Sequence, residues 1–356
     1  MKHRLIRVAH QFVQAAGRRC RNYSTENAVD QTSLIRQLRE KSSAPMKDVK
    51  AALVQCNWDV DIAFTELRKK GLAAVSKKAS RVATEGLLAV CEKPGMASII
   101  ELNSETDFVA RNEIFQHLAS RVACAALSLY EPSEESEPDK MKLDLGLLRD
   151  MPIRLDHPKL SCDTTVQEAI KVTASIMGEN LKLTRAFRMS TKCGLVSSYL
   201  HASPQPGLGK TAALLTLNVN GGSIEPFGEL LSTVGESLAM HIVAARPLFL
   251  NKESVTEDVW EREKGIILSQ VADSKKPEKI LEKMVEGRLR KYAEEVVLLE
   301  QRFAMNDKIT VREVVEDLSK KVGCLVDVGC YLRMEVGETA ESDESSTPAM
   351  VAAQAS

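Results

Sequence analysis

The feature that most constrains the fold is a pattern of two strands followed by a helix, which occurs twice along the chain. Short apolar runs indicate the strands, and turn residues such as Pro94-Gly95 separate them. Apolar residues at three-to-four spacing, as from Phe115 to Leu118, indicate the helices. The expected elements are strands at 86–90 and 97–102 with a helix through 115–129, then strands at 194–200 and 212–219 with a helix at 227–245.

A sheet and a helix must each bury one apolar face against another element. The pattern therefore predicts an α+β fold with two related core subdomains, each a hairpin plus a helix. The first is expected at 84–189, which also holds a helix at 166–177 and a strand at 181–189. The second joins 190–250 to 298–337.

Two other segments have the apolar spacing of helices without strands. Over 31–72, Ser33 is expected to cap a first helix, Pro45 to open a second and Gly71 to end a third. Three short helices can share one small core, so this segment is predicted to be a separate three-helix unit. Over 255–297, helical spacing on both sides of a Lys-Lys-Pro turn, with dense flanking charge, predicts an inserted antiparallel coiled-coil hairpin.

The two ends of the chain differ from the rest in composition. The first 25 residues hold six Lys or Arg, no Asp or Glu, and apolar residues at helical spacing. That pattern is typical of a mitochondrial transit peptide, and Arg21-Asn22-Tyr23-Ser24 resembles a matrix-protease cleavage sequence, so we expect a transit peptide at 1–24 and a matrix location. The alternative is a disordered basic arm. The tail at 338–356, rich in Glu, Ser and Ala, is expected to be disordered.

Charge and hydropathy exclude two classes of protein. Beyond residue 25 the chain has 42 basic and 49 acidic residues, a net charge of −7. This acidic balance argues against a nucleic-acid-binding protein, which normally has a basic footprint. The apolar runs are much shorter than the 18 or so residues of a membrane-spanning helix.

The sequence has no recognisable catalytic, nucleotide or metal motif. The eight cysteines are scattered without a Cys-x-x-Cys pair, so we expect reduced and mostly buried thiols. The four histidines outside the leader are far apart in sequence, which predicts no zinc site. Gly207-Leu208-Gly209-Lys210-Thr211 has Pro204 where a phosphate loop needs its first Gly, and it precedes a strand, so it is interpreted as a basic loop. We therefore expect a protein that is not an enzyme and that needs no cofactor or metal of its own.

The most informative stretch is 103–112. Thr106 or Asp107 can cap the helix that follows. Phe108 lies seven residues before Phe115, on the same helical face, which favours a core position for both rings. The alternative is that the cap holds Phe108 at the mouth of the helix and offers it to a partner, because exposed aromatic anchors contribute strongly to interfaces.

This stretch resembles the signature of the elongation factor Ts family, the guanine-nucleotide exchange factors for elongation factor Tu. Thr106-Asp107-Phe108-Val109 carries the resemblance most specifically, and the basic leader points to a mitochondrial member. The resemblance extends over roughly 31–337 and includes Pro45-Met46-Lys47-Asp48, Gly178-Glu179-Asn180, Ser198-Tyr199-Leu200-His201, Ala239-Met240-His241, Lys283-Met284-Val285-Glu286-Gly287-Arg288 and Arg333-Met334-Glu335-Val336-Gly337-Glu338.

The resemblance implies a fold and a set of partner contacts. The three-helix unit is similar to a ubiquitin-associated fold and is expected to dock on the partner through Arg36, Arg39 and Met46; Lys47 stands where the family often has a second Met. The contacts implied at the partner's nucleotide pocket are Thr106, Asp107, Phe108, Val109, Met177 and His201. The expected partner is mitochondrial elongation factor Tu, with no direct contact to nucleic acid or membrane. The expected activity is release of GDP, with Asp107 and Phe108 disturbing the magnesium side of that pocket.

Two other functions compete with this interpretation. The three-helix unit alone would also fit an adaptor that binds ubiquitin. The lysines of the 275–291 region would fit a protein that binds RNA or the ribosome, although the acidic chain disfavours this.

Overall fold

The structure is a computed structural model that describes residues 26–338, except 43, 45, 79, 130–138, 222–224 and 272–276. The expected transit peptide and nearly all of the expected disordered tail lie outside these residues. The described chain is a mixed α+β protein that divides into two compact units. One unit comprises the residues up to Ser80 and Lys171–Glu179, and the other comprises Arg81–Ile170 and the chain from Asn180 onward.

The first unit begins with three helices that share one apolar core. The helices are α2 (Glu26–Ser42), α3 (Met46–Gln55) and α4 (Val60–Lys78). Their buried residues come from all three helices and are Leu38, Val49, Ala52, Leu53 and Ala63. The expected cap at Ser33 is wrong, because Ser33 lies inside α2, which already includes Glu26.

The C-terminal half of α8 (Val166–Met177) belongs to this first unit. A Cβ atom added at Gly71 of α4 would lie 1.8 Å from the Ser175 hydroxyl oxygen of α8. The missing side chain therefore lets the two helices approach closely. Instead of ending the third helix, as expected, Gly71 lies inside α4.

The second unit contains two sheets. The larger has the strand order β3-β6-β2-β1-β8 and the smaller β12-β9-β7. The strands of these sheets are β1 (Glu85–Lys93), β2 (Met96–Ser104), β3 (Asp139–Lys142), β6 (Lys182–Ser190), β7 (Gly194–His201), β8 (Leu208–Gly209), β9 (Thr211–Asn220) and β12 (Leu325–Glu335). Two small hairpins accompany them, β4 (Pro152–His157) with β5 (Leu160–Thr165), and β10 (Arg302–Phe303) with β11 (Asn306–Thr310).

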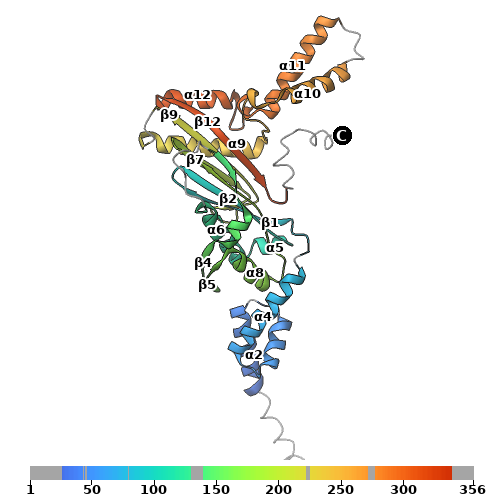
Figure 1. Cartoon of the computed structure of the whole chain (residues 1–356), viewed down its shortest axis with the longest axis vertical. Helices are drawn as coiled ribbons and strands as arrows, with labels where there is room; N and C mark the ends of the chain where they lie inside the picture. The colour runs from blue at the N-terminus through green and yellow to red at the C-terminus, as the bar shows by residue number, and fades with distance from the viewer. Residues whose placement is uncertain are drawn as a thin grey trace, which may run out of the picture. The chain divides into compact units, whose positions relative to one another are not determined.

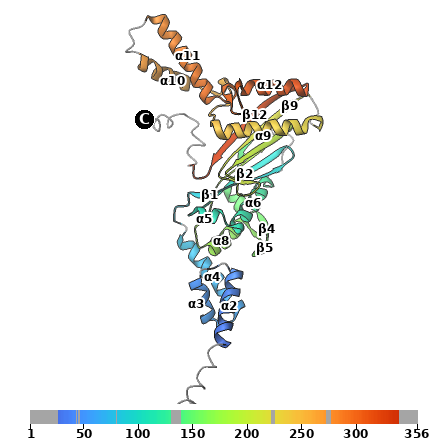
Figure 2. The same ribbon diagram turned by 180° about the vertical axis from the view of Figure 1, so that it is seen from behind.

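Helices cover the outer faces of these two sheets (Figures 1 and 2). The helical elements of the unit, besides the N-terminal part of α8, are α5 (Asp107–Ala110), α6 (Glu113–Leu127), α7 (Leu145–Asp150), η1 (Glu225–Phe227), α9 (Gly228–Ala245), η2 (Lys252–Ser254), α10 (Glu257–Val271), α11 (Glu278–Val296), η3 (Leu298–Glu300) and α12 (Val311–Val322). The α6 helix packs on β1 and β2, where the Ser98 hydroxyl donates to the Ala123 carbonyl at 2.7 Å. The α9 and α12 helices pack on the smaller sheet.

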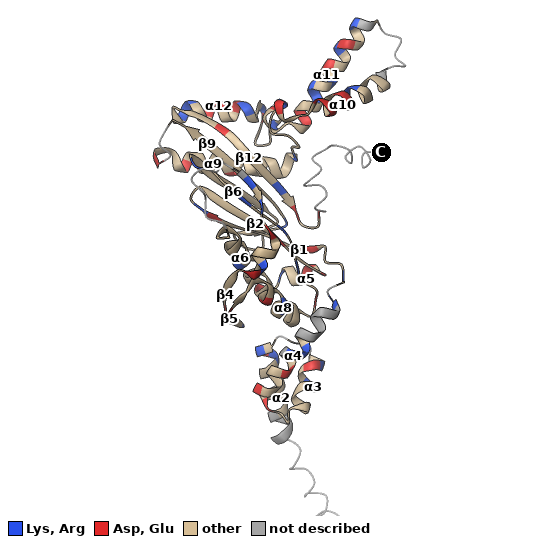
Figure 3. Cartoon of the chain, in the orientation of Figure 1, with Lys and Arg blue, Asp and Glu red and all other residues tan. Residues whose placement is uncertain are grey.

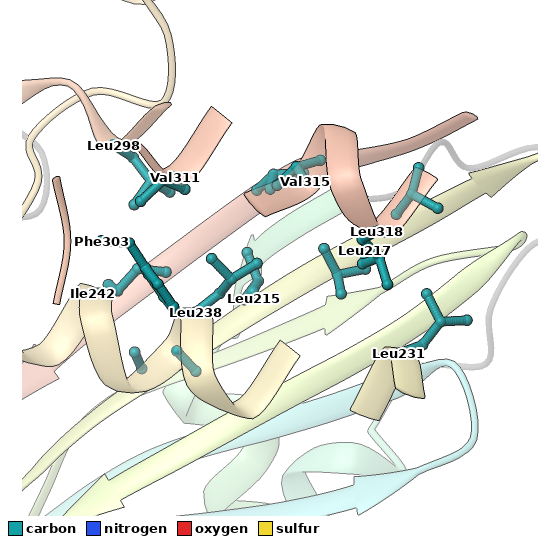
Figure 4. Packing of buried hydrophobic residues seen from close by; sticks show 14 of the residues in the cluster. Leu215, Leu217, Leu231, Leu238, Ile242, Leu298, Phe303, Val311, Val315 and Leu318 are labelled. Carbon is teal, nitrogen blue, oxygen red and sulfur yellow. The ribbon is translucent and has the colours of Figure 1, made fainter. Parts of the chain in front are cut away.

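The sheets pack against each other through apolar side chains. Residues of the larger sheet, such as Leu88 and Ile99, share a cluster with Leu214 and Met334 of the smaller. A second cluster fills the space between the smaller sheet and its two helices: Leu215 and Leu217 meet residues of α9 and α12 (Figure 4). The period of two along each strand supplies both clusters, because alternate residues point to opposite faces.

Three strands of the larger sheet have the same order as the three strands of the smaller one. In each, a hairpin is followed by a helix that packs on it, and a later strand then pairs antiparallel with the second hairpin strand. This gives β6-β2-β1 with α6 in the first sheet and β12-β9-β7 with α9 in the second. The expected strands and helices are observed close to the expected positions, while their division into two related subdomains stays a prediction.

A buried ion pair connects the larger sheet to β12 of the smaller. The Arg185 Nε atom lies 2.6 Å from a Glu101 carboxylate oxygen, and both side chains are 2% exposed. Arg185 also donates to the Glu335 carbonyl at 2.8 Å, and Glu101 accepts from the Gly337 backbone N–H at 2.8 Å. The segment 333–338, which carries part of the family resemblance, thus contributes to this connection.

Helices α10 and α11 form an antiparallel pair. Their contact is apolar near the sheets, where Trp260 and Tyr292 meet edge to face at 5.9 Å, and again at Ile267 and Val285. Their outer surfaces carry Lys and Arg interspersed with Asp and Glu (Figure 3). Among the described residues, no helix has the length and apolarity to cross a bilayer.

Candidate functional site

The turn between β2 and α6 carries the residues that the sequence singled out. The chain leaves β2 at Ser104, makes the single helical turn α5 and enters α6 at Glu113. The expected cap at Thr106 or Asp107 is wrong for the long helix: Asn112 caps it, and its side-chain oxygen accepts from the Ile114 N–H at 2.9 Å. The helix interruption at 111–112 separates Phe108 from α6.

Phe108 is an exposed apolar residue in this turn. It is 76% exposed, whereas Phe115 is fully buried, and the two residues after Phe108 are buried as well, Val109 at 6% and Ala110 at 3%. The turn therefore anchors itself with small apolar side chains and leaves one aromatic ring in solvent. The Phe108 ring is therefore accessible to a partner, whereas the Val109 side chain faces the core, and direct contact of either residue with a partner stays a prediction.

Asp107 has a partner within the turn. Its carboxylate lies 2.7 Å from the Arg111 guanidinium, one helical turn later, and both side chains are substantially exposed. An exposed pair of this kind contributes only about 0.3–0.5 kcal/mol. Asp107 can therefore exchange Arg111 for another partner at little cost.

Hydrogen bonds from several elements fix the turn. The Ser104 hydroxyl donates to the Thr106 carbonyl at 2.8 Å, and the Gln116 side-chain amide donates to the Ala110 carbonyl at 3.0 Å. One Glu105 carboxylate oxygen accepts from the Asn180 backbone N–H at 2.7 Å, and the other lies 3.2 Å from the Arg81 guanidinium. The conformation of the turn is thus defined by residues on both sides of it.

His201 occupies the end of β7 in the same unit. Its side chain is exposed, and its Nδ1 lies 3.4 Å from the Tyr199 hydroxyl. Its backbone carbonyl accepts from the Lys210 N–H at 2.9 Å, which fixes the end of the strand. The ring is therefore available to a partner.

The three expected docking residues are all exposed on the first unit. Arg36 and Arg39 lie on α2 on either side of the buried Leu38, and Met46, at the start of α3, is 50% exposed. Arg36 pairs with Glu40 at 3.1 Å, again as an exposed pair. Exposed guanidinium groups suit binding to an acidic partner surface, and an exposed methionine suits binding to an apolar one.

Met177 is the last residue of α8 and is partly exposed. Gly178 ends that helix with a φ of +73°, and its N–H donates to the Ala174 carbonyl at 2.9 Å. A positive φ is readily adopted only by Gly, so Gly178 fixes where the chain leaves α8 beside Met177.

The histidines that the structure describes are His117, His157, His201 and His241. The structure does bring His117 and His157 together, with ring centroids 5.7 Å apart, although they are 40 positions apart in sequence. His117 pairs with Asp156 at 2.9 Å, and burial lowers the pKa of His117. In the part of the chain that the structure describes, no group of His, Cys, Asp or Glu has an arrangement that could hold a metal ion.

Two further features of the sequence are the cysteines and the glycine-rich loop at 207–211. Mostly buried cysteines were expected, but none of the seven described cysteines is fully buried, and Cys124 and Cys193 are exposed. Leu208–Gly209 forms a short strand paired with β1, and the Lys210 ammonium lies 2.8 Å from Glu85. This loop therefore completes the edge of a sheet.

The residues that support the turn could not be recognised individually from the sequence. Glu105, Arg81 and Asn180 have no individual signal in the chain, because each is a polar residue just outside a strand. Asn180 does end the Gly178-Glu179-Asn180 segment that carries part of the family resemblance. That segment was the one available sign of its importance.

Comparisons with known proteins agree with the resemblance found in the sequence. A family model described as Elongation factor TS matches residues 105–338, a range that begins at Glu105. The mitochondrial elongation factor Ts of Ricinus communis is 52% identical over 329 residues, which cover 92% of this chain and 86% of that protein. The mitochondrial elongation factor Ts of Zea mays is 50% identical over 327 residues, covering 91% and 85%. The elongation factor Ts of Bartonella quintana is 41% identical over 321 residues, covering 90% and 97%.

Proposed function

The chain belongs to the elongation factor Ts family, and on this basis we propose that it is a mitochondrial translation elongation factor that promotes GDP release from mitochondrial elongation factor Tu. Family membership implies nucleotide exchange on elongation factor Tu, and such a factor acts by binding without making or breaking covalent bonds. The location is supported by the close relatives that are named as mitochondrial and by the basic, acid-free first 25 residues.

The proposed mechanism is thermodynamic linkage. The GDP phosphates and Mg²⁺ hold the partner's loops in one arrangement. If this chain binds the nucleotide-free arrangement more tightly, it must weaken GDP by the same factor. GTP then binds the emptied pocket and, by the same reciprocity, displaces the exchange factor.

Phe108 is the residue proposed to disturb the magnesium side of the pocket. Its exposed ring can enter between partner side chains, and burial of a Phe side chain is worth about 1.5–3 kcal/mol. Asp107 can leave Arg111 and bind or repel groups near the phosphates, because their ion pair is weak. Thr106 and Val109 then shape the turn, and His201 and Met177 provide further contacts.

Docking is proposed to use the first unit. Arg36, Arg39 and Met46 are exposed there and can bind the partner independently of the Phe108 turn. Separate contacts for docking and for exchange predict separable effects: loss of docking weakens binding, whereas loss of Phe108 slows GDP release after binding.

The observation that carries the proposal is the 76% exposure of Phe108 in a turn whose next two residues, Val109 and Ala110, are buried. The test is release of labelled GDP from mitochondrial elongation factor Tu. The wild-type chain should accelerate release, and Phe108→Ala should slow the accelerated rate by about tenfold or more, a loss of about 1.4 kcal/mol or more.

Leu325→Ala is the matched control, because it removes another exposed apolar side chain, 63% exposed at the start of β12. It should leave the rate unchanged. A well-folded Phe108→Ala chain that releases GDP as fast as wild type would exclude the proposed role of the ring.

The competing functions have less support. The α11 helix carries acidic residues among its Lys and Arg, which disfavours it as a surface for RNA (Figure 3). Ubiquitin binding by the three-helix unit stays a prediction that pull-down on immobilised ubiquitin can test.

A further inference from the structure

We propose that Arg81 and Asn180 are positioning residues for exchange: they hold Glu105 in place and thereby fix the direction in which Phe108 points. We call Arg81, Glu105 and Asn180 the Glu105 clamp. The inference rests on the proposed function of Phe108 and adds three residues, none of which needs to touch the partner.

The clamp is a closed triangle of contacts. Glu105 accepts from the Asn180 backbone N–H at 2.7 Å and pairs with the Arg81 guanidinium at 3.2 Å. The third side is formed by the Asn180 side-chain amide, which donates to the Arg81 carbonyl at 2.8 Å. Each residue therefore contacts the other two, and the Glu105 side chain at the centre is only 19% exposed.

The clamp lies where three neighbouring strands end. Glu105 directly follows β2, Asn180 precedes β6 and Arg81 precedes β1. The registers bring these ends together, since Ser104 pairs with Glu85 of β1 and Asn103 pairs with Lys182 of β6. The sheet itself thus places the three residues side by side, and the clamp transmits the rigidity of the sheet to the turn.

Two features show why the turn needs this support. α5 is a single turn of helix, too short to be stable alone, and the interruption at 111–112 separates it from α6. A ring that samples many directions binds with an apparent affinity reduced by the fraction of time it spends in the competent one. Glu105 lies two residues before Asp107, and its contacts with Asn180 and Arg81 connect the turn to the residues that precede β6 and β1.

The first test is hydrogen exchange of the backbone amides of 105–112 in the free chain. Glu105→Ala removes both carboxylate contacts, whereas Asn180→Ala removes the side-chain bond to the Arg81 carbonyl and keeps the backbone N–H that donates to Glu105. Both variants should exchange these amides faster than wild type, Glu105→Ala more so, while amides in α9 stay unchanged. Unchanged exchange at 105–112 in both variants would overturn the clamp.

The second test is a double-mutant cycle on labelled-GDP release from mitochondrial elongation factor Tu. Glu105→Ala should slow release by about tenfold when Phe108 is present and should have no further effect in the Phe108→Ala background, because the clamp acts through that ring. Glu105→Gln keeps an acceptor for the Asn180 N–H and should recover part of the rate. Equal losses in both backgrounds would show a role other than positioning Phe108.

A further variant serves as a control, and the two readouts distinguish failure of the clamp from failure of the proposed function. Asp163→Ala removes an exposed ion pair with Arg154 in the same unit and should change neither readout. Thermal unfolding identifies any variant that loses its fold. If Glu105→Ala does so, Asn180→Ala is measured in its place, because it keeps both Glu105 carboxylate contacts. If the wild-type chain fails to speed GDP release, the proposed function is wrong, while hydrogen exchange still decides whether the clamp orders the turn.

Discussion

At the scale of single residues, the position of Phe108 depends on where a helix is interrupted. Seven positions would place Phe108 and Phe115 on one face of a continuous helix. The chain instead ends α5 at Ala110 and restarts at Glu113, so the two rings belong to different helices. The sequence does carry a signal for the restart, since Asn112 is a good cap residue followed by Glu113, but the Thr106-Asp107 pair carries a similar one. Local capping preference alone could not choose between them.

His241 gives a second residue whose role the structure defines. It belongs to the Ala239-Met240-His241 segment, is fully buried and accepts from the Ala304 N–H at Nδ1, 3.1 Å. Its Nε2 therefore carries the proton and donates to the Gln301 side-chain oxygen at 3.0 Å. A protonated ring would lose the bond from Ala304.

We predict that His241 makes the chain less stable in mild acid. Burial lowers the pKa of His241 below its ordinary 6.5, so just below that pH the unfolded chain binds more protons than the folded chain. The free energy of unfolding should then fall as pH drops below about 6.5. His241→Asn should flatten this pH dependence in denaturation curves measured between about pH 5 and pH 8.

His117, whose pKa burial also lowers, should contribute separately, so His117→Asn serves as the comparison. A slope in His241→Asn equal to that of wild type would contradict the prediction.

At the scale of elements, the long helices and the paired strands were predictable, whereas the short strands were not. β8 and β10 have two residues each, and β3 has four. Such strands exist because a neighbouring strand offers hydrogen bonds, and no pattern within two residues can show this. The β4–β5 hairpin is longer, but it carries mainly polar residues on its open face, which weakens its apolar signal.

Close packing of elements produces a prediction that opposes helix propensity. Gly235 lies inside α9, where a Cβ atom would come within 2.0 Å of the Ser197 hydroxyl oxygen and 2.8 Å of its Cβ on β7. Gly235→Ala should therefore destabilise the chain by about 1–3 kcal/mol through overpacking, although Ala favours helix. Gly265→Ala in α10 is the matched control: a Cβ there meets nothing within 4 Å, and the change should stabilise by roughly 0.5–1 kcal/mol. Chemical denaturation measures both. Stabilisation by Gly235→Ala would show that α9 is free to move away from the sheet.

At the scale of the whole molecule, contacts between distant segments set the organisation. Lys171–Glu179 groups with the N-terminal helices, although it lies inside the range expected for the first core subdomain. The close approach of Gly71 and Ser175, about a hundred positions apart, accompanies this grouping, and spacing along the chain does not reveal it. The domain boundaries inferred from sequence stay predictions for that reason.

The Glu101–Arg185 pair allows a test of how the sheets are held together. Arg185→Met leaves the Glu101 carboxylate buried without its cation, and breaking a buried pair in this way costs about 3–5 kcal/mol. Replacing both residues by Met should cost less than the sum of the two single replacements, because neither charge is then left alone. Denaturation of the three variants gives the comparison. Additive losses would show that the two side chains stabilise the fold independently.

The shared order of three strands in the two sheets has a consequence for how the protein tolerates substitutions. An aromatic residue precedes the main helix in both halves: Phe108 before α6 and Phe227 before α9. Phe227, however, packs against the apolar cluster of its own half, whereas Phe108 remains in solvent. The similarity of the two halves therefore provides no substitute for Phe108. A substitution that removes the Phe108 ring cannot be compensated by Phe227, because Phe227 is already packed within its own half.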